Sequence, residues 1–202
     1  MGQRIIGLTG GIATGKSTVS DYLAQRHQVP VLDADLYARR AVERGAAALE
    51  AIVARYGADL IHDDGTLNRG RLGEIVFHDP AEKTWLEQQI HPVVRRCFGA
   101  AMAELSQAPV VVQVIPLLFE ANLSDQVSEI WVVTCALADQ RQRLMQRNGL
   151  SAEQADARIC SQMPLAEKVN RADLVIDNSA DLPALFCRVD DALQHFPQGR
   201  RV

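Results

Sequence analysis

Residues 10–17 read Gly-Gly-Ile-Ala-Thr-Gly-Lys-Ser, and they are the stretch that most restricts how this chain can fold. They fit the pattern of a glycine, four residues and then Gly-Lys-Ser, which is typical of a loop that wraps around phosphate groups. Such a loop lies between a strand and the start of a helix, whose dipole and N–H groups attract an anion. Residues 5–9 fit a buried strand and residues 16–28 fit a helix. The segment therefore predicts nucleotide-phosphate binding.

Five short runs rich in Val and Ile predict the sheet of an α/β fold. They cover residues 4–9, 29–32, 109–115, 129–134 and 174–176. The runs are mostly continuous rather than alternating, which is typical of strands covered on both faces. Helical stretches separate them, including residues 17–26, 136–147 and 182–195. We therefore predict a doubly wound, five-stranded parallel sheet.

The segment between the second and third predicted strands is far longer than one crossover helix needs. It is mostly helical in pattern, with predicted helices at residues 36–43, 46–56, 72–77 and 81–105. Asp79 and Pro80 suit the start of the last of these, as N-cap and first helical residue. Pro92 predicts a break or kink near His91. The block is either an insertion that covers a second substrate or a purely structural addition.

Residues 139–171 form a second unusual segment because they gather basic side chains. These are Arg141, Arg143, Arg147, Arg158, Lys168 and Arg171. Arg143 and Arg147 are four residues apart, so they share one helical face. One interpretation is a solvated basic face, as for most runs of charge. The other is a lid that closes over the nucleotide and brings arginine to a transferring phosphoryl group.

Acidic residues follow two of the predicted strands, at the edge where parallel sheets bind ligands. Asp33 and Asp35 come directly after the second strand. Asp33 is predicted to order magnesium or to accept a proton from a hydroxyl nucleophile. Asp35 either shares in this or only caps the helix that follows. Glu120, at the end of Pro116-Leu117-Leu118-Phe119-Glu120, either faces the site or belongs to an ordinary strand-to-loop transition.

Composition and the absence of other motifs exclude several classes. The chain has 202 residues and a formal net charge of −4, which argues against non-specific nucleic-acid binding. The longest apolar stretch, residues 108–119, is too short to span a bilayer, and no signal-like segment begins the chain. The four cysteines are widely spread and do not support a zinc site. We expect a cytoplasmic monomer that binds neither nucleic acid nor membrane, with a frayed tail at residues 197–202.

Several segments together resemble the dephospho-CoA kinase family. In chain order they are residues 9–12 and 15–18 of the loop, Asp33-Ala34-Asp35, Leu67-Asn68-Arg69 with Val76-Phe77, His91-Pro92, residues 116–120, residues 143–147 and Ile176-Asp177-Asn178. They span nearly the whole chain, and their combination is far more specific than the phosphate loop alone. One departure is Ala13, where the family usually has glycine, so the loop geometry is in question there.

The resemblance implies ATP-dependent phosphorylation of the 3′-hydroxyl of the ribose of dephospho-CoA, which gives coenzyme A and ADP in the final step of coenzyme A biosynthesis. It implies a nucleotide-kinase-like P-loop fold in three parts. These are a core of about residues 1–35, 108–138 and 172–202, a helical insertion of about residues 36–107 for the CoA substrate, and a lid of about residues 139–171.

The same hypothesis assigns roles to particular residues. Asp33, Lys16 and Arg143 are the expected catalytic residues, and Ser17 is the expected ligand of Mg²⁺. The expected ATP-binding residues are Gly11, Ile12, Ala13, Thr14, Gly15, Lys16, Ser17, Thr18, Arg147 and Asn178, the last of them at the adenine. The expected dephospho-CoA-binding residues are Asp35, Asn68, Arg69, His91 and Glu120.

Two rival hypotheses remain. Another P-loop small-molecule kinase, acting on a nucleoside, a nucleotide or shikimate, is the nearer one, because shikimate kinases also place Asp-x-Asp after the second strand. The long insertion and the Pro-Leu-Leu-Phe-Glu segment argue against it. A nucleotide-binding switch is disfavoured because the chain has no guanine-reading Asn-Lys-x-Asp motif and has a candidate base in Asp33.

Overall fold

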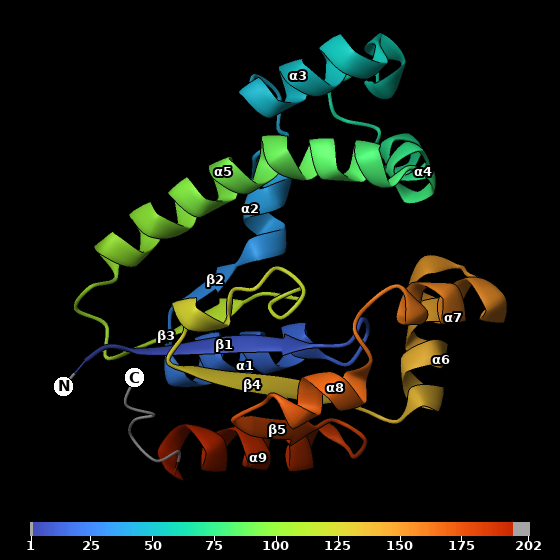
Figure 1. The fold of residues 1–202 in the computed structure, drawn as a ribbon. Coiled ribbons are helices and arrows are strands. Elements are labelled where there is room, and N and C mark those ends of the chain that lie inside the picture. Colours follow the sequence, from blue (N-terminus) through green and yellow to red (C-terminus); the bar gives the residue numbers. More distant parts are fainter. Residues whose placement is uncertain (1, 196–202) are drawn as a thin grey trace. The chain divides into compact units, whose positions relative to one another are not determined.

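The computed structural model describes residues 2–195, and these divide into two compact units (Figure 1). Unit 1 comprises Met1–Leu32 and Leu105–Val202, and unit 2 comprises Asp33–Glu104. Each unit has its own hydrophobic core. The predicted frayed tail, residues 197–202, lies outside the described residues.

Unit 1 is built on a five-stranded parallel sheet with the strand order β2-β3-β1-β4-β5. The strands are β1 (Arg4–Gly10), β2 (Val31–Asp33), β3 (Val110–Val114), β4 (Glu129–Thr134) and β5 (Leu174–Asp177). This confirms the predicted α/β class, with strand ends that differ by no more than two residues from the prediction. Strand β1 pairs with β3 on one side and β4 on the other, so it is the central strand.

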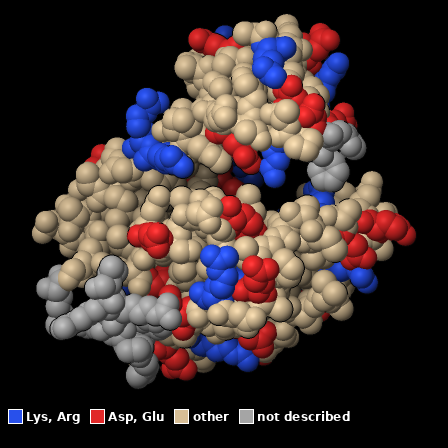
Figure 2. All heavy atoms as spheres, in the orientation of Figure 1, with Lys and Arg blue, Asp and Glu red and all other residues tan. Residues whose placement is uncertain are grey.

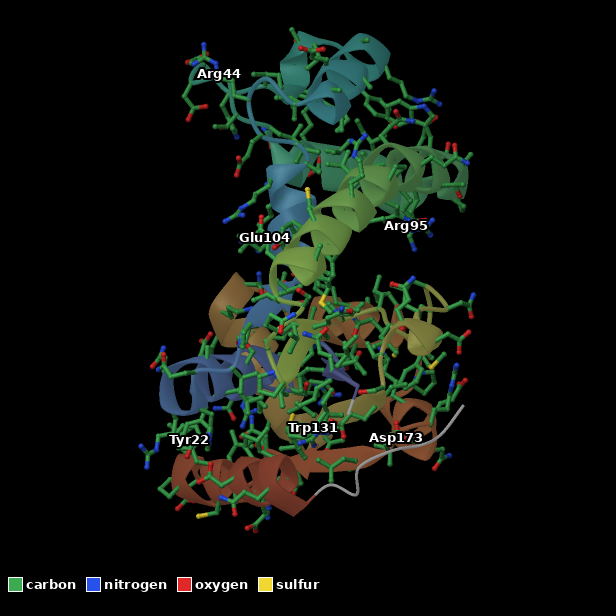
Figure 3. All side chains as sticks on the ribbon, turned by 90° about the vertical axis from the view of Figure 1, so that its left-hand side faces the viewer. Tyr22, Arg44, Arg95, Glu104, Trp131 and Asp173 are labelled. Carbon is green, nitrogen blue, oxygen red and sulfur yellow. The ribbon has the colours of Figure 1, made fainter. Side chains whose placement is uncertain are left out.

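Helices α1 (Lys16–His27) and α9 (Leu182–His195) pack against one face of this sheet (Figure 1). Because strand side chains alternate between faces, Ile6 and Leu8 of β1 join the core with both helices. The Trp131 side chain, labelled in Figure 3, is fully buried in the same core. Tyr22 of α1 stacks on Phe186 of α9 with ring centroids 4.0 Å apart, which ties the two helices together.

The remaining helices of unit 1 lie between β3 and β5 in the chain. They are η2 (Ser124–Gln126), α6 (Leu137–Asn148), α7 (Ala152–Cys160) and α8 (Leu165–Asn170). Arg141 of α6 and Asp156 of α7 form a two-point ion pair with N–O distances of 2.6 and 2.9 Å. Arg141, one of the basic residues of segment 139–171, therefore has an ion-pair partner within that segment.

Unit 2 is helical and consists of α2 (Ala34–Arg40), α3 (Ala47–Tyr56), η1 (Ala58–Leu60), α4 (Arg69–His78) and α5 (Pro80–Glu104). Its core is a separate apolar cluster that includes Leu49, Ile52, Leu60 and Leu72. The unit thus buries side chains of its own, as an independent packed layer requires.

The predicted start of α5 is confirmed, whereas a break near His91 is wrong; a kink there stays a prediction. Asp79 Oδ1 accepts hydrogen bonds from the backbone N–H groups of Ala81 and Glu82, and Pro80 is the first helical residue. The helix then continues unbroken through Pro92 to Glu104. Pro92 is exposed, so the carbonyl that loses its partner to proline can be solvated by water.

Glu82 connects α5 to α3 and makes the stability of unit 2 depend on pH. Its carboxylate accepts two hydrogen bonds from Arg55, each 2.7 Å long, and one from the hydroxyl of Tyr56. These bonds lower the pKa of Glu82 from 4.5 to about 2. A carboxyl group with a depressed folded pKa stabilises the fold above its unfolded pKa, and this contribution is lost as the pH falls from 4.5 towards 2.

We expect Glu82→Gln to lower the urea midpoint of unfolding at pH 7 and to approach the wild type as the pH falls below 4.5. The measurement is a series of urea titrations between pH 7 and pH 3, followed by circular dichroism. Glu74→Gln is the matched control, because Glu74 is an exposed carboxylate of the same unit. A constant offset between wild type and Glu82→Gln across this range would contradict the assignment.

The surface carries both signs of charge. On the face drawn in Figure 2, Lys and Arg side chains are interspersed with Asp and Glu side chains. Among the described residues, no helix is both long enough and apolar enough to cross a membrane.

Candidate active site

The phosphate loop joins the central strand to the first helix. Strand β1 ends at Gly10 and helix α1 begins at Lys16, as the sequence pattern predicts. The first N–H groups of a helix have no partner within it, so they are available to an anion at this point. Thr14 stabilises the turn, since its hydroxyl donates a 2.9 Å hydrogen bond to the carbonyl of Gly11.

Two glycines of the loop are required by their surroundings. Gly10 has φ 146° and Gly15 has φ 101°, a backbone region that side chains disfavour. A Cβ at Gly10 would overlap with the carbonyl oxygen of Val133. A Cβ at Gly15 would overlap with the side-chain nitrogen, Nδ2, of Asn178. The spacing of the pattern thus reflects close contacts with β4 and with the end of β5.

Ala13, the residue that departs from the family pattern, has a left-handed backbone with φ 59°. This conformation costs an L-residue about 1–2 kcal/mol, whereas glycine adopts it freely. The loop therefore keeps its geometry with alanine at this position, at the cost of local strain. Other contacts must hold the strained segment in place.

Lys16 lies folded against its own loop. Its Nζ donates hydrogen bonds to the carbonyl oxygens of Gly11, at 2.7 Å, and Gly10, at 3.2 Å. The side chain is half-buried. Its positive charge is therefore held next to the backbone of Gly10 and Gly11.

Arg143 of α6 lies beside the loop. Its Nη2 donates a 3.2 Å hydrogen bond to the carbonyl of Asn178, and its Nη1 is 3.9 Å from where a Cβ of Gly15 would be. Burial raises the pKa of the Cys135 thiol, and the positive charges of Arg143 and Lys16 both act against that shift. The two cations are thus within electrostatic reach of one thiol at the end of β4.

The other predicted ATP-binding residues lie in different environments. Asn178 is buried, and its side-chain nitrogen donates a 2.9 Å hydrogen bond to the carbonyl of Thr14, so its amide supports the loop directly. Arg147 is exposed and bonds the neighbouring Asn148 at 3.0 Å. Ser17 is exposed and Thr18 half-buried in the first turn of α1.

Asp33 is the last residue of β2 and the N-cap of α2. Its Oδ1 accepts hydrogen bonds from the backbone N–H groups of Asp35, at 2.8 Å, and Leu36, at 3.3 Å. The alternative prediction that Asp35 caps this helix is therefore wrong, because α2 begins at Ala34, two residues before the start at Leu36 that a cap at Asp35 needs. Asp35 lies instead in the first turn, where the helix dipole stabilises a carboxylate.

Glu120 forms an ion pair with a lysine that sequence reasoning counted only as part of a basic run. Lys168 of α8 is fully buried, and its Nζ lies 2.8 Å from Glu120 Oε1 and 3.1 Å from the carbonyl oxygen of Pro116. The backbone N–H of Met163 donates to the same Oε1 at 3.1 Å. Burial raises the pKa of Glu120, but the hydrogen bonds from Lys168 and from backbone N–H groups hold it below its usual range.

The predicted substrate residues of unit 2 lie on α4 and α5. Asn68 caps α4 by accepting a 3.1 Å hydrogen bond from the backbone N–H of Arg71. The guanidinium of Arg69 donates a 3.2 Å bond to the carbonyl of Arg39. Burial and the positive charge of Arg39 lower the pKa of Arg69, so two cations lie close together there. His91 is exposed on α5.

Sequence reasoning missed two glutamines that contact the loop. The Nε2 of Gln140, on α6, donates a 2.6 Å hydrogen bond to the carbonyl of Ile12. The Oε1 of Gln162, between α7 and α8, accepts a 2.9 Å bond from the N–H of Ile12. No local pattern marks these residues, because they lie 128 and 150 positions away from their partner.

A sequence model of the dephospho-CoA kinase family matches residues 4–184 of this chain. The chain belongs to that family. A dephospho-CoA kinase of Synechocystis sp. is 58% identical over 193 residues, which cover 96% of each chain. A dephospho-CoA kinase structure from Campylobacter jejuni is 29% identical, with a TM-score of 0.70 over 94% of this chain and 95% of the other. A crystal structure from Thermus thermophilus is 36% identical, with a TM-score of 0.85 over 98% and 100%.

The match to the dephospho-CoA kinase family covers nearly the whole chain. The chain is an ATP-dependent kinase. The matched range takes in the strands of the sheet and the helices of both units, and it ends at the start of α9.

Proposed function

We propose that this member of the family transfers the γ-phosphoryl group of ATP to the 3′-hydroxyl of the ribose of dephospho-CoA, giving coenzyme A and ADP. The observation that carries the proposal is the phosphate loop between β1 and α1, with Lys16 folded on it, in a chain that the family model matches over residues 4–184. Phosphoryl transfer requires mainly positioning and neutralisation of charge, and both can be provided by this loop and its neighbours.

The proposed phosphate site consists of the backbone of residues 11–17 and two cations. Lys16 exchanges its hydrogen bonds with Gly10 and Gly11 for the outer phosphates of ATP. Arg143 supplies a second charge from the edge of the loop, where its Nη1 lies near Gly15. Arg147 and Asn178 complete the predicted ATP-binding set, with Asn178 acting through its bond to Thr14.

Mg²⁺ fits this site through phosphates rather than through a cage of side chains. Among the side chains that the structure describes, no group of three or more His, Cys, Asp or Glu could hold a metal ion. Mg²⁺ usually keeps several waters and is held by substrate phosphates and few protein ligands, so one exposed hydroxyl is compatible with it. Ser17 would hold the ion, which neutralises phosphate charge when bound.

Asp33 is the proposed base for the ribose hydroxyl. Both backbone hydrogen bonds go to Oδ1. Among the described residues none donates to Oδ2, which leaves this oxygen for the hydroxyl proton. Asp35, Asn68, Arg69 and His91 stay proposed contacts of dephospho-CoA, and Arg39 joins them because it places a second charge next to Arg69. For Glu120 we propose that it positions α8 rather than binding dephospho-CoA. Its carboxylate forms an ion pair with Lys168 and accepts a hydrogen bond from the N–H of Met163.

The proposed reaction is tested by turnover with ATP and a panel of acceptors. ADP release should be fast with dephospho-CoA and near background with adenosine or shikimate, and the product should be identified as coenzyme A by mass spectrometry. Equal or faster turnover with shikimate or adenosine would favour another P-loop kinase. Nucleotide binding without acceptor-dependent turnover would favour a switch.

Arg143→Ala is expected to lower kcat by about 100-fold with little change in either KM, because a charge that acts on the transferring group is lost. The measurement is steady-state kinetics with each substrate varied in turn. Gln146→Ala, an exposed change on the same helix, serves as the control. A raised KM for ATP at unchanged kcat would make Arg143 a binding residue only.

The monomeric state, the cytoplasmic location and the absence of nucleic-acid and membrane partners stay predictions. Size-exclusion chromatography with light scattering would test the first of them directly.

A further inference from the structure

We propose that Gln140 and Gln162 are positioning residues for phosphoryl transfer, which act by holding the backbone of Ile12 in the phosphate loop at both its N–H and its carbonyl. The inference rests on the proposed function of the loop. It extends the set of residues that serve the reaction to two side chains that bond the loop itself.

Each glutamine uses a different half of its amide. Gln140 donates from Nε2 to the carbonyl oxygen of Ile12 at 2.6 Å, and Gln162 accepts at Oε1 from the N–H of Ile12 at 2.9 Å. Hydrogen bonds at both the N–H and the carbonyl restrict how far the residue can rotate about its backbone. Gln140 is buried, so its bond is protected from water.

The loop is shaped to admit Gln140. Gly11 has no positive φ, so its backbone conformation does not require glycine. A Cβ at this position would lie 2.7 Å from Nε2 of Gln140. The glycine therefore opens the space through which the amide reaches Ile12.

Gln162 is held in place from the other side. The next residue, Met163, donates its N–H to Glu120 Oε1 at 3.1 Å, and the same oxygen lies 2.8 Å from the fully buried ammonium of Lys168. The segment between α7 and α8 is thus fixed to the residues after β3. This gives the ion pair of Glu120 and Lys168 a role in setting the position of Gln162.

The effect of holding Ile12 falls on the strained residue next to it. Ala13 has φ 59°, a conformation that persists in an L-residue only when neighbouring contacts impose it. When the backbone of Ile12 is held, it has the orientation that the left-handed conformation of Ala13 requires. The N–H groups that follow are thereby kept in the orientation that binds phosphate.

The test is the kinetics of Gln162→Leu and Gln140→Leu, which keep most of the side-chain volume and remove the hydrogen bonds. We expect kcat/KM for ATP to fall by about 10- to 100-fold, while KM for dephospho-CoA stays within about twofold, because only the donor site is displaced. Gln142→Leu, an exposed change on α6, is the matched control. Wild-type kinetics in both variants, or a lower melting temperature as their only effect, would overturn the proposal.

A second arm tests the route through Ala13. In an Ala13→Gly background the left-handed turn costs little, so Gln162→Leu should reduce kcat/KM for ATP several-fold less than it does with alanine present. An equal reduction in both backgrounds would overturn the proposal that the clamp acts on Ala13. If Gln140→Leu does not fold, Gln162→Leu carries both arms, because Gln162 is only half-buried. If dephospho-CoA is not the acceptor, the same variants are compared by their ATP affinity, measured by calorimetry. A loss of affinity in Gln162→Leu that is smaller in the Ala13→Gly background supports the proposal, and an equal loss overturns it.

Discussion

Lys16→Ala is expected to lower kcat by about 1,000-fold. The ammonium is the one charge that the loop itself carries, and it lies 2.7 Å from the carbonyl of Gly11. Without it, the charge that builds up on the phosphoryl group in the transition state has lost its nearest cation. Steady-state ADP release with dephospho-CoA measures the effect, together with a thermal melt that reports on folding.

Two further variants sharpen this experiment. Lys83→Ala removes an exposed lysine on α5 and should leave turnover unchanged. Lys16→Arg keeps the charge, but the planar guanidinium is a poor substitute for a compact ammonium held between two carbonyls. We expect it to recover little of the lost rate. A folded Lys16→Ala variant with near-normal turnover would contradict the proposed mechanism.

Asp33→Asn is expected to lower kcat by about 100- to 10,000-fold while the protein stays folded, because the proposed base is lost. Asn caps a helix about as well as Asp does, so its Oδ1 can still accept from the N–H groups of Asp35 and Leu36. The substitution therefore separates proton transfer from helix capping. The measurements are kcat with dephospho-CoA and the urea midpoint.

Asp33→Ser and Asp33→Ala complete the set. Serine also caps but cannot act as a carboxylate base, so it should resemble asparagine in both rate and stability. Alanine should lose a further amount of about 1 kcal/mol in stability, because the cap is removed as well. If Asp33→Asn turns over at the wild-type rate, the residue is a cap and another group accepts the proton.

Local sequence rules predict the parts of this fold in which neighbours along the chain decide the structure. The Val- and Ile-rich runs give five strands, and the Gly-Lys-Ser pattern marks the junction of β1 and α1. Asp79 and Pro80 start α5 as their residue types suggest. In each case the preference and the structure involve the same few residues.

The rest depends on contacts that no local pattern contains. Pro92 predicts a break or kink in α5, but its exposed position lets the helix continue without a break. Lys168 belongs to a basic run that suggested a solvated face or a lid, yet it is fully buried against Glu120. Gln140 reaches Ile12 across 128 positions in the chain. Such partners become predictable only once the order of the strands is known.

Asp33 lies at the junction between the sheet and the helical unit. It ends a strand of the sheet and is the first residue of unit 2, and its carboxylate is bonded to the first turn of α2. The proposed base is therefore oriented by the start of α2, whereas the phosphate loop is oriented by β1 and α1. A substitution that shifts the first turn of α2 would then also shift the proposed base, without any change in the loop residues themselves.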